Sequence, residues 1–440
     1  MSAAGLRLDQ APPFFVPLRF FITAPIFGAL AAATLLAGGP QALASRWTPT
    51  ALAATHLLTL GFLTMTMVGA LMQLLPVLAG SPLRHPRTVA TVVHGLLSAG
   101  TLALAANFLI PGPVLQFVSL AALSVGLGVF LFAAGASLAR ARSDATVLAM
   151  RLAATGLLIT LLIGVLIGLG GTPSRFSADK TSTDMHLASG LIGWIAILVM
   201  GVAYQVVPMF QLTRAYPSWL RRWLVPLLFV ALLLWIIAAR MAHALPALFA
   251  ALSLGLVATV LAIFAVTTLW LQSQRKRRLP DATVRFWTLS MIGLLAAVSI
   301  MAGHAVGIIV EPRFALLAVA WLIVGFGISA VHGMLYKIVP FLAWLHLNAA
   351  GASSAQTNMK AFLPDSQALP HVWLHAAAVA LLAPAVLADP RWIYPAALAL
   401  LGSFIWLGRN LVLATLLYLR LQRASKSPQA STEKIVGTAR

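Results

Sequence analysis

Cysteine is absent from this 440-residue chain. That absence excludes a disulfide framework, a thiolate metal site and a cysteine-bound iron–sulfur cluster. Histidine, with ten copies, is then the main residue type left to bind a soft or borderline metal ion.

Acidic residues are almost as scarce as cysteine. Asp and Glu together number nine, and all of them fall in loops, tails or predicted helix ends rather than inside apolar runs: Asp9, Asp144, Asp179, Asp184, Asp281, Glu311, Asp365, Asp389 and Glu433. A buried carboxylate is the usual ligand or proton carrier inside a membrane. The pattern therefore disfavours a carboxylate-bridged di-iron site, a carboxylate-driven proton pump and most ion-coupled transporters.

Apolar residues dominate what remains. Hydrophobic residues make up 61% of the chain and charged residues 9%, and the mean hydropathy is +0.96. This composition predicts an all-α polytopic membrane protein, with the lipid bilayer as its main partner. The formal net charge of +20 comes from Lys and Arg that lie mainly between apolar runs, where they set topology and do not indicate nucleic-acid binding.

Twelve segments are apolar enough and long enough to cross a hydrocarbon core of about 30 Å as helices. The predicted spans are 15–38, 51–79, 88–110, 114–139, 147–170, 184–211, 219–243, 246–272, 285–309, 314–343, 371–388 and 393–419. They form one transmembrane domain over residues 1–424. The polar segment 425–440 is predicted to be a disordered tail.

The loop charges predict the orientation. Arginine and lysine concentrate in alternate connections, which include Arg84, Arg140, Arg214, Arg221 and the run that starts at Arg275. By the positive-inside rule these connections face the cytoplasm, so both termini are predicted to be cytoplasmic in a bacterial inner membrane.

One eight-residue pattern occurs three times. It reads Gly, three residues, Gln or Lys, two aliphatic residues and Pro, and its glycines are Gly69, Gly201 and Gly333, each 132 residues from the next. A repeat held in this register predicts three four-helix pseudo-repeats, at about 15–139, 147–272 and 285–419. We expect the glycines to allow close helix packing and the prolines to end or kink each helix.

The polar position of this motif is occupied by Gln73, Gln205 and Lys337. Two interpretations are open for these residues. Long polar side chains about a turn from the membrane surface can extend to the interface. Alternatively, they line a polar path through the protein.

Histidines inside apolar segments are the candidate ligands. His56 lies 17 residues before Gln73 and His186 lies 19 before Gln205, at corresponding depths of two predicted helices. Ionisable residues at such depths usually face the bundle interior. His304 and His332 are the next candidates, and neutral imidazoles from different helices suit a b-type haem or three-coordinate copper.

The other intramembrane polar residues have a structural interpretation. His94, His243, His371 and His375 are predicted near helix ends, where histidine is often only interfacial, although the i, i+4 spacing of His371 and His375 also fits a two-histidine metal clamp. Arg409 lies inside the last predicted span and needs an anionic or carbonyl partner, for which a haem propionate is one candidate.

The run Thr55–Phe62, which leads to Gly69 and Pro76, together with the Pro17–Phe21 opening and three four-helix blocks, resembles the haem–copper oxidase subunit I superfamily. Within it, the chain is most similar to NnrS-like haem- and copper-containing membrane proteins linked to nitric oxide metabolism. The resemblance implies a haem b held by helix histidines, with His56 matching the ligand early in the second helix. It implies copper as a further cofactor and a quinol or c-type cytochrome as electron donor.

The chain departs from the oxidase pattern at its metal-binding motifs. It has a single His332 where oxidases carry His-x-His, and His186 and His243 replace their other copper ligands. Tyr204 and Tyr336 stand near no second histidine in the sequence. We therefore expect electron transfer or respiratory gas metabolism rather than oxygen reduction. A haem-free transporter and an oxidoreductase with an unusual ligand set remain as alternatives.

Overall fold

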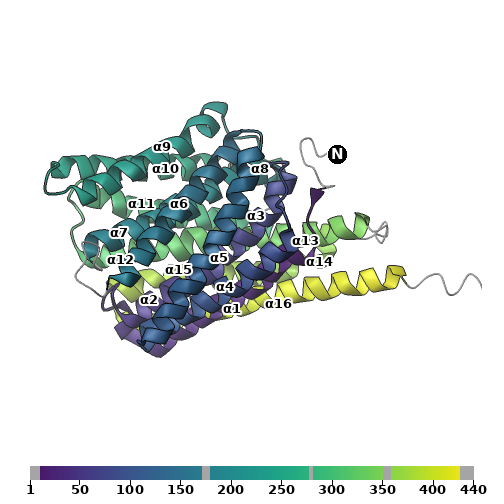
Figure 1. The fold of residues 1–440 in the computed structure, drawn as a ribbon, viewed down its shortest axis with the longest axis horizontal. Helices are drawn as coiled ribbons and strands as arrows, with labels where there is room; N and C mark the ends of the chain where they lie inside the picture. Colours follow the sequence, from purple (N-terminus) through teal and green to yellow (C-terminus); the bar gives the residue numbers. More distant parts are fainter. Residues whose placement is uncertain (1–9, 171–178, 277–280, 350–357, 427–440) are drawn as a thin grey trace, which may run out of the picture.

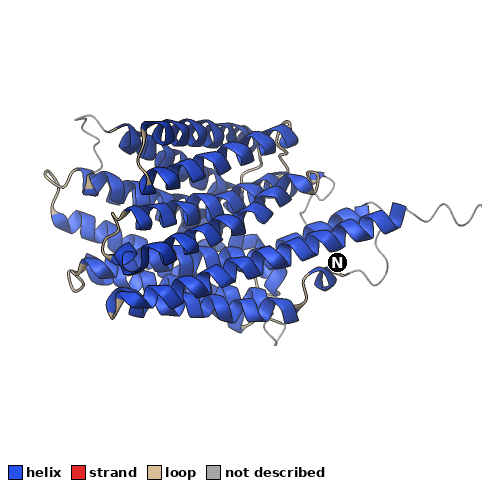
Figure 2. Ribbon diagram, turned by 90° about the horizontal axis from the view of Figure 1, so that it is seen from below, coloured by secondary structure: helices blue, strands red, loops and turns tan. Residues whose placement is uncertain are grey.

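The computed structural model describes residues 10–170, 179–276, 281–349 and 358–426, and these ranges contain helices and no strands. Twelve helical segments within them are long and apolar enough to cross a bilayer (Figure 2). The predicted all-α membrane fold with twelve spans is confirmed. Most of the predicted disordered tail, from residue 427 onward, lies outside the described residues.

The elements follow the three predicted blocks. The first block contains α1 (Phe15–Gly38), η2 (Gly39–Leu43), α2 (Pro49–His56), η3 (Leu57–Thr64), α3 (Met65–Val77), α4 (Pro86–Leu109) and α5 (Pro113–Arg140). The second contains α6 (Ala145–Leu169), α7 (Lys180–Ala188), η4 (Ser189–Ala196), α8 (Ile197–Gln211), α9 (Ser218–Arg240) and α10 (Ala247–Ser273). The third contains α11 (Ala282–Ala305), α12 (Pro312–Ala320), η5 (Trp321–Ile328), α13 (Ser329–Ala349), α14 (Met359–Phe362), α15 (Asp365–Leu387), η6 (Pro390–Trp392) and α16 (Ile393–Lys426).

The second helix of each block is an inner span, and the three inner spans are α2–η3–α3, α7–η4–α8 and α12–η5–α13. Between 67% and 83% of their most apolar stretch is buried, against 17% to 44% for the other nine spans. Each inner span contains an eight-residue π-helical segment, and η3, η4 and η5 begin 132 residues apart. The backbone thus repeats with the period of the sequence motif.

The three inner spans meet at equivalent positions of the repeat. A Cβ added to Gly327 would contact the side chains of Leu63 and Ile195, which precede it by two repeats and one repeat. Nearby, the indole N–H of Trp194 donates a hydrogen bond to the Thr64 hydroxyl (3.1 Å). Figure 1 shows α2, α7 and α12 gathered at one end of the bundle, with α3, α8 and α13 at the end where both described chain ends lie.

Two glycines in each repeat bring the inner span against the first helix of its own block. A Cβ on Gly69 would lie 2.7 Å from Phe20 in α1, and one on Gly333 would lie 2.9 Å from Trp287 in α11. The equivalent atom on Gly201 would overlap Ala149 in α6. A second set, Gly61, Gly193 and Gly325, packs in the same way against Phe27, Gly156 and Gly293. The predicted role of glycine in close helix packing is confirmed.

Three predicted boundaries differ from the structure, all in the third block. The tenth span continues to Ala349 and the last helix to Lys426. The eleventh begins at Asp365, six residues before the predicted start, so His371 and His375 are not near a helix end but about two turns inside it. Pro340 lies inside α13, because a proline costs one backbone hydrogen bond and need not end a helix whose neighbours pack around it.

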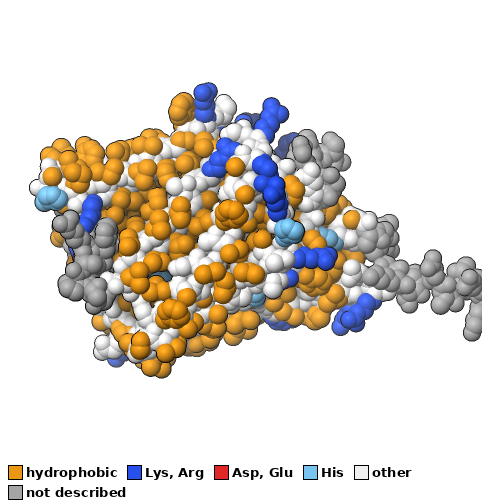
Figure 3. All heavy atoms as spheres, viewed as in Figure 1, with side chains coloured by type: hydrophobic (Ala, Val, Ile, Leu, Met, Phe, Trp, Pro, Cys, Tyr) orange, Lys and Arg blue, Asp and Glu red, His pale blue; other side chains and the backbone are white. Residues whose placement is uncertain are grey.

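Each described acidic residue lies at a helix end or in a connection, where it caps a helix or pairs with a cation. Asp144, Asp179 and Asp281 accept hydrogen bonds from the first turns of α6, α7 and α11. Asp184, Asp281, Glu311, Asp365 and Asp389 form ion pairs with Lys or Arg. Figure 3 shows a largely apolar surface with most of the visible Lys and Arg side chains toward the end of the bundle where α16 finishes.

We predict that Gly201→Ala destabilises the protein by about 1–3 kcal/mol, because the new methyl group overlaps Ala149 in a packed core. Gly255→Ala in α10 is the matched control, since nothing lies within 4 Å of the added Cβ, and it should be neutral or stabilising by up to about 1 kcal/mol. Thermal unfolding in detergent measures both. Equal melting temperatures for the two variants would contradict the packing role.

Candidate functional site

The two leading histidine candidates lie next to each other. His56 is the last residue of α2 and His186 belongs to α7, and both are half-buried at the end of the bundle opposite the chain ends (Figure 1). Their ring centres are 6.3 Å apart and their planes differ by 26°. The prediction that these residues meet is confirmed, and their role as ligands remains a prediction.

Both imidazoles are held through the same ring nitrogen. The Nδ1 atom of His56 lies 2.8 Å from the Leu52 carbonyl oxygen, and that of His186 lies 3.0 Å from the Thr160 carbonyl oxygen in α6. A carbonyl can only accept, so each Nδ1 carries the proton and each Nε2 keeps its lone pair. In the described part of the chain, neither Nε2 has a hydrogen-bond partner. Metal-binding histidines are commonly oriented in this way.

The surroundings fix this His56–His186 pair further. Phe108 at the end of α4 packs on His56, with ring centres 5.1 Å apart. Gly164 leaves room for His186, because a Cβ there would lie 2.9 Å from the imidazole Cε1. Asp184, one turn of backbone before His186, pairs with Arg46. These contacts place both rings without using either Nε2.

The chain before His186 is held by a helix cap. The Asp179 carboxylate accepts a hydrogen bond from the Ser182 backbone N–H (2.6 Å) at the start of α7. This hydrogen bond lowers the pKa of the Asp179 carboxyl below its usual range, so the cap persists at neutral pH.

The donor set and spacing of the pair fit a bound metal. A metal–nitrogen bond of about 2.0 Å, with roughly 1.2 Å from that nitrogen to the ring centre, separates two opposed imidazole centres by about 6.4 Å. The observed 6.3 Å therefore suits one metal ion between the rings, either the iron of a b-type haem or copper. No rearrangement of the two helices is required to reach that spacing.

A second group of histidines lies in the core of the third block. His332 in α13 and His371 and His375 in α15 are completely buried. The ring centre of His332 is 4.7 Å from that of His371 and 4.6 Å from that of His375. The interfacial interpretation of His371 and His375 is wrong, because α15 starts earlier than predicted and carries both residues into the bundle.

A hydrogen-bonded chain runs through this cluster. The Ser329 hydroxyl donates to the Val324 carbonyl, so it accepts from His375 Nε2 (3.0 Å). His375 Nδ1 then accepts from the Ser403 hydroxyl (3.2 Å), which accepts from His371 Nε2 (2.8 Å). Because His371 Nδ1 is left unprotonated, it accepts from the hydroxyl of Tyr336 (2.9 Å).

This chain uses both ring nitrogens of His371 and His375. Neither ring keeps a free lone pair, which agrees with the finding that no three histidines or acids of the described residues are placed to hold a metal ion. The chain continues to the Asn410 side chain, whose Nδ2 donates to Tyr336 (2.8 Å). The sequence gave no indication that Tyr336 meets a histidine, because His371 is 35 residues away in another helix.

His332 differs from its two neighbours. Neither of its ring nitrogens has a hydrogen-bond partner. Five aromatic rings, from Phe62, Phe286, His371, His375 and Phe404, have centres 4.6 to 5.5 Å from its own. A haem macrocycle would have to displace these rings, so we do not assign a haem to His332.

The remaining candidates lie apart from both histidine groups. His304 is exposed in the last turn of α11, where its Nδ1 lies 2.9 Å from the Ile309 carbonyl oxygen. Arg409 is exposed on α16, where it donates to the Asn410 side chain (3.1 Å) and lies over the Trp406 ring. Its partner is thus a neighbouring amide and an aromatic face. The sequence-based expectation of an anionic partner is not needed to explain it.

The three polar motif residues have three different environments. Gln73 is 5% exposed and its amide has no partner, whereas Gln205 is exposed. Lys337 forms a 2.7 Å ion pair with Asp281 at the start of α11. They do not line one polar path in common.

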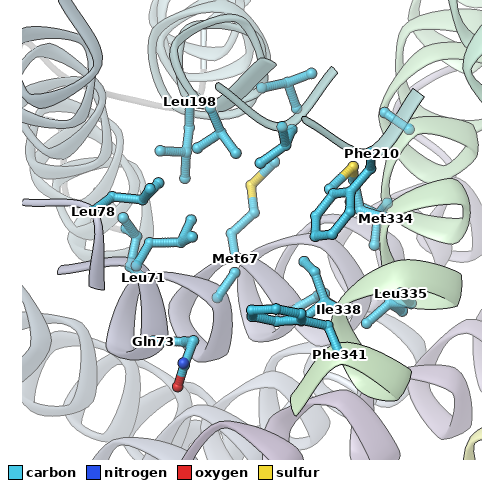
Figure 4. A pocket seen from close by; sticks show the side chains of 18 of the residues that line it. Met67, Leu71, Gln73, Leu78, Leu198, Phe210, Met334, Leu335, Ile338 and Phe341 are labelled. Carbon is cyan, nitrogen blue, oxygen red and sulfur yellow. The ribbon is translucent and has the colours of Figure 1, made fainter. Parts of the chain in front are cut away.

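A cavity lies between α3, α8 and α13, in the half of the bundle nearest the chain ends. It holds about 1000 Å³, including the open space at its mouth, and its walls are almost entirely apolar. Figure 4 shows Met67, Leu71 and Ile338 around this space, with Gln73 at its edge. Trp287 of α11 also lines it.

Comparison with known proteins gives no further guide. No protein-family model matches the chain, and no curated protein is similar enough to be related to it. The fold and site define its class as a multi-pass helical membrane protein with two buried or half-buried groups of histidines.

We predict that His332→Leu leaves the free energy of unfolding unchanged or raises it, because the variant removes a buried imidazole whose nitrogens are unpaired. His371→Leu should lower it by about 1–3 kcal/mol, since Tyr336 and Ser403 each lose a hydrogen-bond partner. Thermal unfolding in matched detergent compares the two. A larger loss for His332→Leu than for His371→Leu would show that the proposed hydrogen-bonded chain is assigned incorrectly.

Proposed function

We propose that this chain is a haem b-binding protein of a bacterial inner membrane, with His56 and His186 as the two axial ligands. The observation that carries the proposal is the geometry of that pair. Their ring centres are 6.3 Å apart and both Nδ1 atoms donate to carbonyl groups, which leaves both Nε2 lone pairs available. Copper held by the same two nitrogens is the second candidate cofactor.

Two histidine ligands favour electron transfer at this site over gas binding. When bound through both axial positions, a b-type haem supplies one-electron transfer. His56 and His186 would leave no open coordination position for nitric oxide or oxygen. Leu52 and Thr160 hold the two rings in a fixed orientation, so little reorganisation accompanies a change of charge between them.

The resemblance to the haem–copper oxidase superfamily and to NnrS-like proteins agrees with this proposal in architecture. The three four-helix blocks and the helix-2 position of His56 support it. A role in nitric oxide or respiratory metabolism, with a quinol or a c-type cytochrome as electron donor, follows from that resemblance. The ends of the chain lie on the cytoplasmic side in this proposal, because the Arg-rich connections lie at the same end of the bundle.

The alternative of a haem-free transporter is less well supported. It requires the polar motif residues to line a common substrate path, but Gln205 is exposed and Lys337 pairs with Asp281. Among the three, Gln73 lines the central cavity. The described acids are also committed to helix caps and ion pairs, which leaves no free buried carboxylate among them for ion coupling.

We predict a sharp b-type α-band in the dithionite-reduced minus oxidised spectrum of the purified protein, expressed with haem supplied. His56→Ala and His186→Ala should each remove the low-spin band, because each takes away one axial ligand. Carbon monoxide should shift the spectrum of either variant and leave that of the unmodified protein unchanged, since the variants open a coordination position.

His94→Ala is the matched control, because His94 is a half-buried histidine whose Nε2 bonds to Thr23, away from the pair. Its spectrum should match that of the unmodified protein. A protein that remains colourless with haem supplied, yet binds copper with loss in both pair variants, would move the assignment from haem to copper. A protein that binds neither would refute the proposed function.

A further inference from the structure

The central cavity contains two buried polar side chains that have no partner. Gln73 is 5% exposed and Trp287 is 1% exposed, and both line the cavity. Neither atom of the Gln73 amide is hydrogen-bonded, and the indole N–H of Trp287 is also unpaired. Leaving such groups unpaired in an apolar interior costs about 1–3 kcal/mol each. Unpaired groups in a cavity wall therefore indicate a ligand that pairs with them.

The cavity wall restricts the chemistry of that ligand. No lysine, arginine, histidine, aspartate or glutamate is among the lining residues, so a charged headgroup would be buried without a counter-charge. Lys337, the nearest motif cation in sequence, is committed to Asp281. The one lining hydroxyl, that of Thr66, donates to the Phe62 carbonyl. The ligand must therefore be neutral and mostly apolar.

The unpaired groups also define the polar atoms of the ligand. An indole N–H can only donate, so the ligand must present an acceptor to Trp287. The Gln73 amide can donate to a second acceptor or accept from a hydroxyl. A flat head with two carbonyl or hydroxyl oxygens on an apolar body meets both requirements.

We propose that the cavity between α3, α8 and α13 binds a membrane quinone, with Trp287 and Gln73 as the hydrogen-bonding residues for its head. Met67, Met334 and Phe341 supply a flexible apolar wall for the ring and chain. Such a ligand dissolves in the bilayer and can reach a cavity inside the helix bundle. As an electron partner for the haem it rests on the proposed function, whereas its binding rests on the cavity alone.

The cavity is structurally connected to the buried histidines. A Cβ on Gly333 would lie 2.9 Å from Trp287 and 3.0 Å from Phe286, and the Phe286 ring packs on His332. Ala330 and Val331, which precede His332 in α13, form part of the cavity wall. Occupancy of the cavity should therefore influence the packing around His332.

The test is binding of decylubiquinone to the full-length protein in phospholipid nanodiscs, measured by equilibrium dialysis with and without haem. Trp287→Phe should raise the dissociation constant about tenfold, because it removes one hydrogen bond and keeps the ring. Gln73→Leu should raise it by a similar factor. Ala330→Phe, which fills the cavity, should abolish binding.

Gln205→Leu is the matched control, because Gln205 occupies the equivalent repeat position but is exposed. His56→Ala separates the two proposals, since it should remove haem and leave quinone binding intact. Equal affinity in the unmodified protein and in Trp287→Phe, Gln73→Leu and Ala330→Phe would overturn the assignment. So would a phospholipid that native mass spectrometry finds bound and that decylubiquinone does not displace.

Discussion

The close approach of three inner helices to the helices around them is the constraint on which this fold depends. Gly61, Gly193 and Gly325, and again Gly69, Gly201 and Gly333, have neighbouring atoms where a side chain would be. Because these helices are buried on nearly all sides, the surrounding protein replaces lipid along most of their length. Any polar group on them must then find its partner inside the protein.

The scaffold is threefold, but its chemistry is not. The repeat places Val68, Met200 and His332 at equivalent, fully buried positions, and it places a polar residue at Gln73, Gln205 and Lys337 in three unlike environments. The candidate sites all arise where one repeat departs from the others. A repeated backbone thus supplies rigid walls, and single substitutions in those walls supply ligands and hydrogen-bonding groups.

Hydropathy and the 132-residue period were sufficient to predict the spans, the blocks and the meeting of His56 with His186. Long apolar runs leave few alternatives to a transmembrane helix, and equivalent positions of a repeat face a common centre. The start of α15 was mispredicted because Asp365 and Pro370 lower local hydropathy, although Pro370 is tolerated inside the helix. That six-residue error moved His371 and His375 from the core to the surface in the prediction.

Other features left no local trace in the sequence. The π-helical segments depend on backbone packing, and the contact between Tyr336 and His371 joins two helices. The cavity depends on how α3, α8 and α13 diverge, and its unpaired Gln73 and Trp287 come from separate spans of the first and third blocks. Side-chain partners of this kind follow from tertiary structure and not from spacing along the chain.

The most direct test of the central claim, that His56 and His186 hold one metal between them, is low-temperature electron paramagnetic resonance of the oxidised, metal-loaded protein. The geometry predicts a low-spin ferric signal typical of two imidazole ligands, converted to a high-spin signal when either histidine is replaced by alanine. A metal signal that is unchanged in both variants would contradict the account, because the ligands would then lie elsewhere in the chain.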